Sequence, residues 1–203
     1  MMDEGEIKWN EYYIPGTTVF KNKLGITNEE ELQQVEADIT FQKLLELYDN
    51  PIAGNFDVEH FRTIHKYLFE DIYYFAGEFR NVEMHRYTTF VNSKEIEFRL
   101  NAILREMQED ILKCQSYQQC VSFLAEFYYS LTDVHPFREG NGRTIREFLR
   151  EFVDIYMPQY KLRWSKMDKK ALLEGLVYGI MGKGLLEIEF RNGLVDREEK
   201  ISR

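Results

Sequence analysis

The strongest constraint on this chain is a run of polar and glycine residues that passes directly into an amphipathic helical pattern. The run spans residues 133–150 and reads DVHPFREGNGRTIREFLR. Apolar side chains then recur at i, i+3, i+4 and i+7, at Ile145, Phe148, Leu149 and Phe152. This period predicts a helix that begins near Asn141 or Gly142 and buries one of its faces.

The glycine-rich loop before this helix predicts an anion site. Gly140 and Gly142 allow backbone angles and close approaches that a Cβ would forbid, and Asn141 adds an amide. The first N–H groups of a helix lack intrahelical partners, and the helix dipole favours negative charge beside them. Arg143 and Arg146 lie one turn apart and can bind further phosphate oxygens through bidentate hydrogen bonds. We therefore expect a di- or triphosphate here.

The same loop also carries residues that predict chemistry on that anion. Glu139 is a hard oxygen ligand, of the kind that Mg²⁺ accepts together with substrate phosphates. His135 is the nearby group expected to be neutral and basic at pH 7, as a general base must be. Arg138 joins the candidate phosphate ligands. Together they predict transfer of a phosphorus-centred group to a hydroxyl.

Each part also has an ordinary structural interpretation. A lone histidine after a helix is often a loop residue or a cap, and the Glu-Gly-Asn-Gly run can be a simple turn. The arginine-bearing helix can be amphipathic with solvated charges. Their occurrence together favours the site. The loop is not a P-loop, because no lysine follows its second glycine at the required spacing.

Residues 135–146, HPFREGNGRTIR, resemble the signature of the Fic family, H-x-F-x-[D/E]-G-N-G-R-x-x-R, with every specified position filled. Residues 23–26 (KLGI) and 69–80 (FEDIYYFAGEFR) also resemble the N-terminal half of that family. The resemblance covers roughly residues 20–190. It implies an all-α helical bundle with a small β-hairpin flap over the active site.

The expected organisation is an N-terminal arm at 1–20, a Fic domain at 21–190 and a charged C-terminal tail at 191–203. A length of 203 residues suits one domain with its own core, and 44% hydrophobic with 30% charged residues is usual for a globular protein. Histidines at 60 and 65 are expected in the core or on the surface, because metal pairs on a helix prefer i, i+4.

Helices outside the motif are predicted from caps and apolar periods. They start at the Thr27 capping box and run over 57–75, 93–114, 116–134 and from about 165 to Gly182. Residues 185–203 are predicted to form an apolar patch, a glycine turn and the charged tail.

The resemblance implies that the chain moves AMP from ATP to a Tyr, Thr or Ser hydroxyl of a target protein. Mg²⁺ held by Glu139 would bridge the α- and β-phosphates. The turn at 140–142, Asn141 included, would stabilise charge on the α-phosphate, and Arg143 and Arg146 would orient the leaving phosphates. His135 would take the proton from the target hydroxyl.

Residues 79–93 lose the helical period and suit an extended hairpin, although a loop over the core fits the same pattern. The resemblance favours a hairpin flap that binds an extended segment of the target by strand addition. The residues that match its docking positions are Thr89, Phe90 and Val91. Phe137 is expected to anchor the motif loop in the core.

The donor and the regulation are argued from the same resemblance. Gly142 stands where the phosphorylating Doc-type branch carries lysine, which favours AMP; transfer of UMP, phosphocholine or phosphate, and a non-catalytic nucleotide-binding adaptor, are the alternatives. Many Fic proteins carry an inhibitory helix, [S/T]-x-x-x-E-[G/N]. Its nearest match here, at Glu174, has Lys170 where Ser or Thr is required. This predicts a toxin-like, class I-like enzyme restrained by a small antitoxin-like partner whose glutamate reaches Arg146.

The net charge and the apolar pattern disfavour several other classes of binding partner. A net charge of −9 disfavours general binding of nucleic acid or of a membrane surface, because phosphate would be repelled. The sequence has no apolar run of bilayer length and no N-terminal signal pattern, so we expect a cytoplasmic protein. Cys114 and Cys120 are too few for a disulfide framework.

Overall fold

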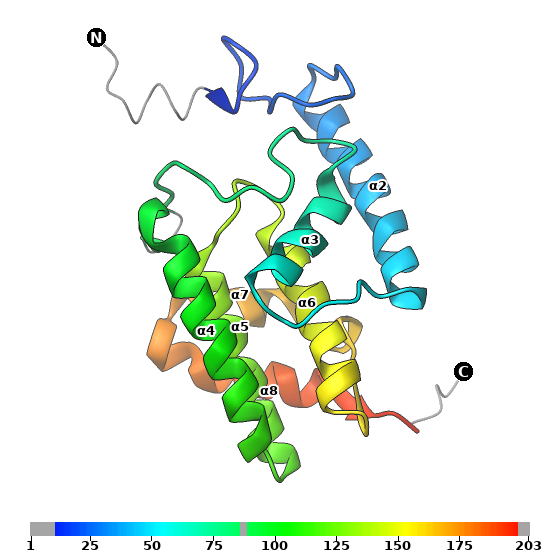
Figure 1. The fold of residues 1–203 in the computed structure, drawn as a ribbon, viewed down its shortest axis with the longest axis vertical. Helices are drawn as coiled ribbons and strands as arrows, with labels where there is room; N and C mark the ends of the chain where they lie inside the picture. Colours follow the sequence, from blue (N-terminus) through cyan, green and yellow to red (C-terminus); the bar gives the residue numbers. More distant parts are fainter. Residues whose placement is uncertain (1–10, 86–88, 199–203) are drawn as a thin grey trace.

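The computed structural model describes residues 11–85 and 89–198, and within them the chain is a bundle of helices (Figure 1). Its α-helices are α2 (Glu29–Asp49), α3 (Val58–Phe69), α4 (Ile96–Asp110), α5 (Tyr117–Val134), α6 (Asn141–Tyr156), α7 (Lys169–Val177) and α8 (Lys183–Gly193). Short 3₁₀ turns are η1 (Ser93–Glu95), η2 (Ile111–Lys113), η3 (Trp164–Lys166) and η4 (Gly179–Gly182). The prediction of an all-α bundle is confirmed.

Side-chain caps start four of these helices at polar residues with extended backbones. Asn28, Asp57, Ser116 and Asp168 each accept a hydrogen bond from the backbone N–H three residues later. The cap of α2 is therefore Asn28 and not the expected Thr27. A cap satisfies an N–H that the helix itself leaves unpaired, which explains why these starts are readable in the sequence.

The motif helix α6 lies at the centre of the bundle, packed against α3, α5 and the strand β1 (Tyr160–Leu162). Its predicted apolar face is buried to 1% exposure or less. Aromatic rings fill the space around it: Phe148 meets Phe56 and Phe61 edge to face, at centroid distances of 5.4 and 5.0 Å. The helix that carries the candidate arginines is thus held rigidly.

The C-terminal region differs from expectation. Residues 183–193 form α8, which packs on α5 and α7, and β2 (Leu194–Asp196) pairs antiparallel with β1. The predicted apolar patch and glycine turn are wrong, because the chain forms another helix directly after Gly182. A Cβ at Gly182 would lie 2.2 Å from the Gly175 carbonyl oxygen, so this glycine permits close packing of η4 on α7. The predicted domain limit at residue 190 falls inside α8; that division stays a prediction.

In the described residues the predicted flap has one antiparallel bridge and not a regular two-stranded hairpin. The bridge joins His85 and Thr89, whereas the β1–β2 pair belongs to the C-terminal region. The Phe90 N–H also donates to the Met84 carbonyl at 3.3 Å. Residues 86–88, between the two sides, lie outside the described part, as do 1–10 of the expected arm and 199–203 of the expected tail.

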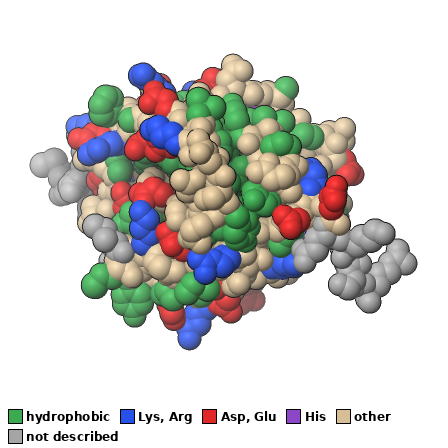
Figure 2. All heavy atoms as spheres, turned by 90° about the horizontal axis from the view of Figure 1, so that it is seen from below, with side chains coloured by type: hydrophobic (Ala, Val, Ile, Leu, Met, Phe, Trp, Pro, Cys, Tyr) green, Lys and Arg blue, Asp and Glu red, His purple; other side chains and the backbone are tan. Residues whose placement is uncertain are grey.

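The surface mixes charge and apolar groups. Figure 2 shows one face of the molecule, where acidic and basic side chains are interspersed around a band of apolar ones. Among the described residues, no helix combines the length and the apolar character needed to span a bilayer.

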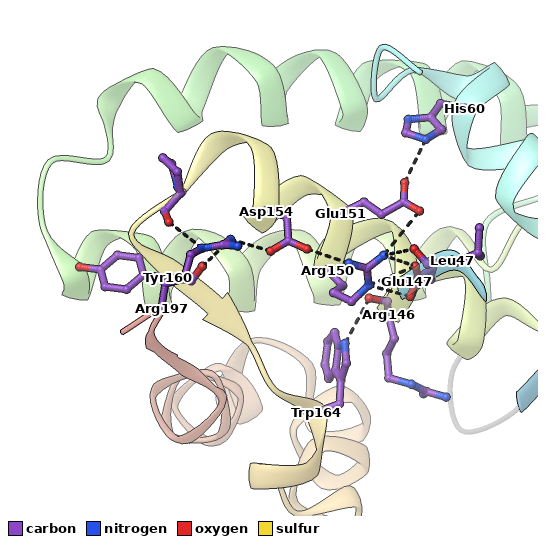
Figure 3. Close-up of polar contacts among 11 residues, drawn as sticks. Leu47, His60, Arg146, Glu147, Arg150, Glu151, Asp154, Tyr160, Trp164 and Arg197 are labelled. Atoms are coloured by element: carbon purple, nitrogen blue, oxygen red, sulfur yellow. Dashed lines mark hydrogen bonds and ion pairs between the residues drawn. The ribbon is translucent and has the colours of Figure 1, made fainter. Parts of the chain in front are cut away.

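A buried ionic network runs along α6, on the C-terminal side of the motif arginines (Figure 3). Arg150 donates to Glu147 at 2.5 Å, to Asp154 at 2.7 Å and to the Leu47 carbonyl of α2 at 3.0 Å. Glu151 lies 3.2 Å from the Nε2 of His60 on α3, a histidine that is buried in the core as expected. The alternative of solvated charges on this helix is therefore wrong at these positions.

We predict that Arg150→Ala lowers the free energy of unfolding by about 3 kcal/mol or more, because it leaves the buried carboxylates of Glu147 and Glu151 without their cation. Urea unfolding at pH 7 measures the change. Arg105→Ala, an exposed arginine on α4, is the matched control and should change stability by less than about 0.5 kcal/mol. A loss in Arg150→Ala no larger than in the control would contradict a structural role.

Candidate active site

The loop between α5 and α6 is bracketed by two residues in the left-handed conformation. His135 caps the end of α5 with φ of 46°, and Gly140 precedes α6 with φ of 80°. A Cβ at Gly140 would meet ring carbons of Phe69 at 2.3 Å, so glycine is required there by both backbone and space. The chain therefore turns sharply between His135, at the end of α5, and Gly140, at the start of α6.

Asn141 braces this loop and does not project into the expected anion site. Its Oδ1 accepts from the Phe137 N–H at 2.8 Å, and its Nδ2 donates to the Phe137 carbonyl at 2.8 Å. The side chain is buried, with 3% exposure. The prediction that the Asn141 amide binds phosphate is corrected: its amide closes the turn, so the turn itself offers an anion backbone N–H groups of the helix start and not this side chain.

Phe137 anchors the loop in the core, as predicted, and His65 of α3 supports it. The imidazole of His65 stacks on Phe137 with ring centroids 3.7 Å apart. Its Nδ1 accepts from the Gly77 N–H at 2.8 Å, so Nε2 carries the proton and donates to the Glu139 carbonyl at 3.0 Å. Burial lowers the pKa of His65 to about 3, which keeps this ring neutral.

Arg143 is oriented by side chains that the sequence did not reveal. Its guanidinium donates to Glu36 of α2 at 2.5 Å and to Thr40 at 3.2 Å, and it lies 4.7 Å from the Phe69 ring centroid. The hydroxyl of Tyr73 donates to the other oxygen of Glu36. No local pattern predicts this ion pair, because 107 positions separate the partners.

Arg146 lies half-buried, one turn further along α6, with its backbone carbonyl accepting from the Trp164 indole at 3.1 Å. Burial lowers the pKa of Arg146, and the Tyr128 hydroxyl interacts with it. Gly142 is an ordinary helical residue, so its expected special backbone angle is wrong. A Cβ there would approach the Arg146 Nη1 at 3.2 Å, so the glycine leaves room for the guanidinium.

Glu139 is the candidate metal carboxylate, and its side chain is 43% exposed. One oxygen accepts from the Gly140 N–H at 2.8 Å. The side chain borders a cavity of about 260 Å³ between α2 and residues 18–20 of the arm. The described residues contain no group of three or more His, Cys, Asp or Glu placed to hold a metal ion. A single carboxylate nevertheless suits Mg²⁺, which takes further oxygens from substrate phosphates and water.

Arg138 does not join the other motif arginines. Its guanidinium is packed among the rings of Tyr12, Tyr13 and Phe20, with centroids 5.6, 5.3 and 4.8 Å away. It also donates to the Tyr13 hydroxyl. The structure therefore gives Arg138 the role of binding the arm to the motif loop, and its predicted role as a phosphate ligand is not supported.

His135 meets the flap directly. The Phe90 ring lies parallel to the imidazole, with centroids 4.0 Å apart and 9° between the planes. Of the predicted docking residues, Thr89 is exposed and Val91 is half-buried, with its N–H donating to the Asp133 carbonyl at 3.3 Å. The structure thus places the predicted base and the predicted flap side by side.

Comparison with known proteins identifies this arrangement. The Fic/DOC family model matches residues 55–153, from the loop before α3 into the motif helix α6. This stretch is a Fic/DOC domain. It is 29% identical over 188 residues to protein adenylyltransferase VbhT of Bartonella schoenbuchensis, covering 91% of this chain and 39% of VbhT.

A second relative is the probable protein adenylyltransferase Fic of Escherichia coli K12, with 29% identity over 173 residues and 84% of each chain covered. The chain thus spans well under half of VbhT but most of the E. coli protein. Among solved structures, BepC of Bartonella tribocorum with bound AMPPNP superposes with a TM-score of 0.83 at 22% identity, covering 93% of this chain and 98% of BepC. This likeness shows a common Fic fold.

Titration of His65 makes the stability of this Fic domain depend on pH. The unfolded imidazole binds a proton near pH 6.5, whereas the folded one does so only near pH 3. The unfolded chain therefore holds more protons between these values, and stability is lost as pH falls from 6.5 toward 3. His65 should contribute a slope of up to about 1.4 kcal/mol per pH unit.

Urea unfolding between pH 7 and pH 5 tests this. His65→Gln cannot titrate, so the loss of stability on acidification should be smaller in the variant than in the wild type. An equal loss in both proteins would show that the folded His65 titrates normally.

Proposed function

We propose that this chain is a protein adenylyltransferase that moves AMP from ATP to a Tyr, Thr or Ser hydroxyl of a target protein. The observation that carries the proposal is the loop between two left-handed residues, His135 and Gly140, which leads directly into the helix of Arg143 and Arg146. The names of the relatives and the AMPPNP bound to BepC support the same reaction.

In the proposed reaction His135 takes the proton of the target hydroxyl as its oxygen attacks the α-phosphorus. A bond forms between that oxygen and phosphorus, the bond from the α-phosphorus to the α,β-bridging oxygen breaks, and pyrophosphate leaves. Positioning and fixed electrostatics supply most of the acceleration in transfers of this type. The tight turn from His135 to Gly140 provides that positioning here.

The phosphates would lie along the start of α6. Its first N–H groups face them, and Arg146 forms no ion pair with any described residue, so it is the cation best placed to bind the leaving phosphates. Arg143 already shares its charge with Glu36 and Glu139, and these partners fix its direction. Glu139 would hold Mg²⁺, which supplies positive charge against the phosphate oxygens when bound.

We further propose that inhibition comes from a separate antitoxin-like protein whose glutamate binds Arg146. The internal candidate, Glu174, pairs with Lys170 at 3.8 Å on α7. Among the described residues, Glu36 and Glu139 pair with a motif arginine, and both meet Arg143. Arg146 therefore remains open to a partner. The cytoplasmic location stays a prediction.

The test is transfer of radiolabel to protein in a cell lysate, with Mg²⁺. Label in the α-phosphate of ATP should enter protein, and label in the γ-phosphate should not. His135→Ala should lower the rate roughly 10²-fold or more, a usual contribution of a general base. Transfer of the γ-label would indicate phosphorylation, transfer from UTP or CDP-choline alone would indicate another group, and no transfer at all would leave a nucleotide-binding adaptor.

A second prediction concerns regulation. Glu174→Gln should leave the rate of AMP transfer unchanged, because Glu174 is paired within α7 and does not reach Arg146. The same lysate assay with purified variant and wild type measures this. A rise of tenfold or more in the variant would show that Glu174 inhibits the enzyme from within and would remove the argument for a separate inhibitor.

A further inference from the structure

A buried arginine, Arg80, joins the flap to the loop that carries His135. It is only 2% exposed. Its Nη1 donates to the Val82 carbonyl at 2.7 Å and its Nη2 to the Val91 carbonyl at 2.5 Å, one on each side of the flap. Its Nε donates to the His135 carbonyl at 2.8 Å, and Nη2 also reaches the Val134 carbonyl at 3.3 Å. One rigid guanidinium thus fixes both stems of the flap and the end of α5.

The position of this guanidinium has a physical reason. The last carbonyls of a helix lack intrahelical donors, and positive charge near them is favourable. Arg80 supplies both hydrogen-bond donors and a positive charge at the C-terminus of α5. Burial lowers the pKa of Arg80, yet an arginine starts high enough to keep its charge. The Arg80 backbone N–H also donates to the Pro136 carbonyl at 2.9 Å, so the left-handed His135 is held on both sides.

The second contact is the stack of Phe90 on His135. A face-to-face contact at 4.0 Å uses only the π-surface of the imidazole. The hydrogen-bonding directions of both ring nitrogens lie in the ring plane, away from this contact. The stack therefore restricts rotation of the imidazole without occupying the atom that would accept a proton.

We propose that Arg80 and Phe90 are positioning residues for His135. Arg80 fixes the backbone of the flap relative to that of the base, and Phe90 fixes the plane of the imidazole. The strand proposed to receive the target, Thr89–Val91, then also orients the group that deprotonates the target. The catalytic part of this inference rests on the proposed function; the structural part does not.

The structural part is tested on the free protein by NMR. A stacked ring shields the protons of the imidazole beneath it, and the His135 resonances are assigned by their disappearance in His135→Gln. Phe90→Leu should move them downfield, and Arg80→Lys should move them in the same direction, because lysine cannot bind four carbonyls as a planar fork. Phe98→Leu, an exposed phenylalanine on α4, is the matched control and should leave them unchanged. His135 shifts in Phe90→Leu equal to those of the wild type would overturn the proposal.

The catalytic part is tested by kinetics with two acceptors, the target proteins of a lysate and water. Phe90→Leu should lower kcat roughly tenfold or more with both acceptors, because misplacement of a catalytic group slows any acceptor. The KM for ATP should stay unchanged, and Phe90→Tyr, which keeps the ring, should restore the rate. A loss confined to protein acceptors would make Phe90 a docking residue only and overturn its positioning role.

Coupling between the two residues completes the test. Arg80→Lys and Phe90→Leu together should slow transfer no more than the slower single variant, because both act through the same imidazole. Multiplied effects would show independent roles and overturn the joint proposal. Thermal unfolding of each variant separates misfolding from misplacement. If the wild type transfers no AMP, the proposed function fails, while the NMR result still decides whether Arg80 and Phe90 hold His135.

Discussion

The reversal of the chain between α5 and α6 determines where every candidate catalytic group lies. Two left-handed residues, His135 and Gly140, enclose a loop whose centre, Phe137, is sealed into the core. The amide of Asn141 closes this loop with two hydrogen bonds of 2.8 Å. A left-handed histidine is strained, and such strain persists only where surrounding contacts over-determine it. Stacking by His65 and the donors of Arg80 are those contacts.

The arginines of the motif region show how one residue type serves several purposes. Arg138 binds the arm through aromatic rings, and Arg150 neutralises the buried carboxylates of Glu147 and Glu151. Arg143 is held by Glu36, while Arg146 forms no ion pair with a described residue. Charge that is already paired contributes little new attraction to an incoming anion. In the proposed function we therefore expect the phosphates to bind chiefly to Arg146 and the helix start.

Supporting groups come from nearly every part of the chain. Glu36 belongs to α2, His65 to α3, and Arg80 to the segment that leads into the flap. The β1–β2 pair and the Arg197 side chain, which binds Asp154 at 2.6 Å, hold the far end of α6. A Fic domain built this way positions a short polar loop by using most of its core, which is why the family motif alone describes the chemistry but not its support.

The sequence alone was enough for the all-α class, the main helices and the existence of the motif loop, because those features are local: caps, periods and glycines act within a few residues. The sequence was not enough where packing between distant segments determines what a residue contacts. The segment after Gly182 was predicted as an apolar patch and a turn, but it forms α8, which is stabilised by packing on α5. The predicted roles of Asn141, Arg138 and Gly142 also changed, because their neighbours in the fold determine what these residues contact. Glu36, Arg80 and the Phe90 stack were determined only by tertiary structure, since a side chain's partner across the fold leaves no periodic trace in the chain.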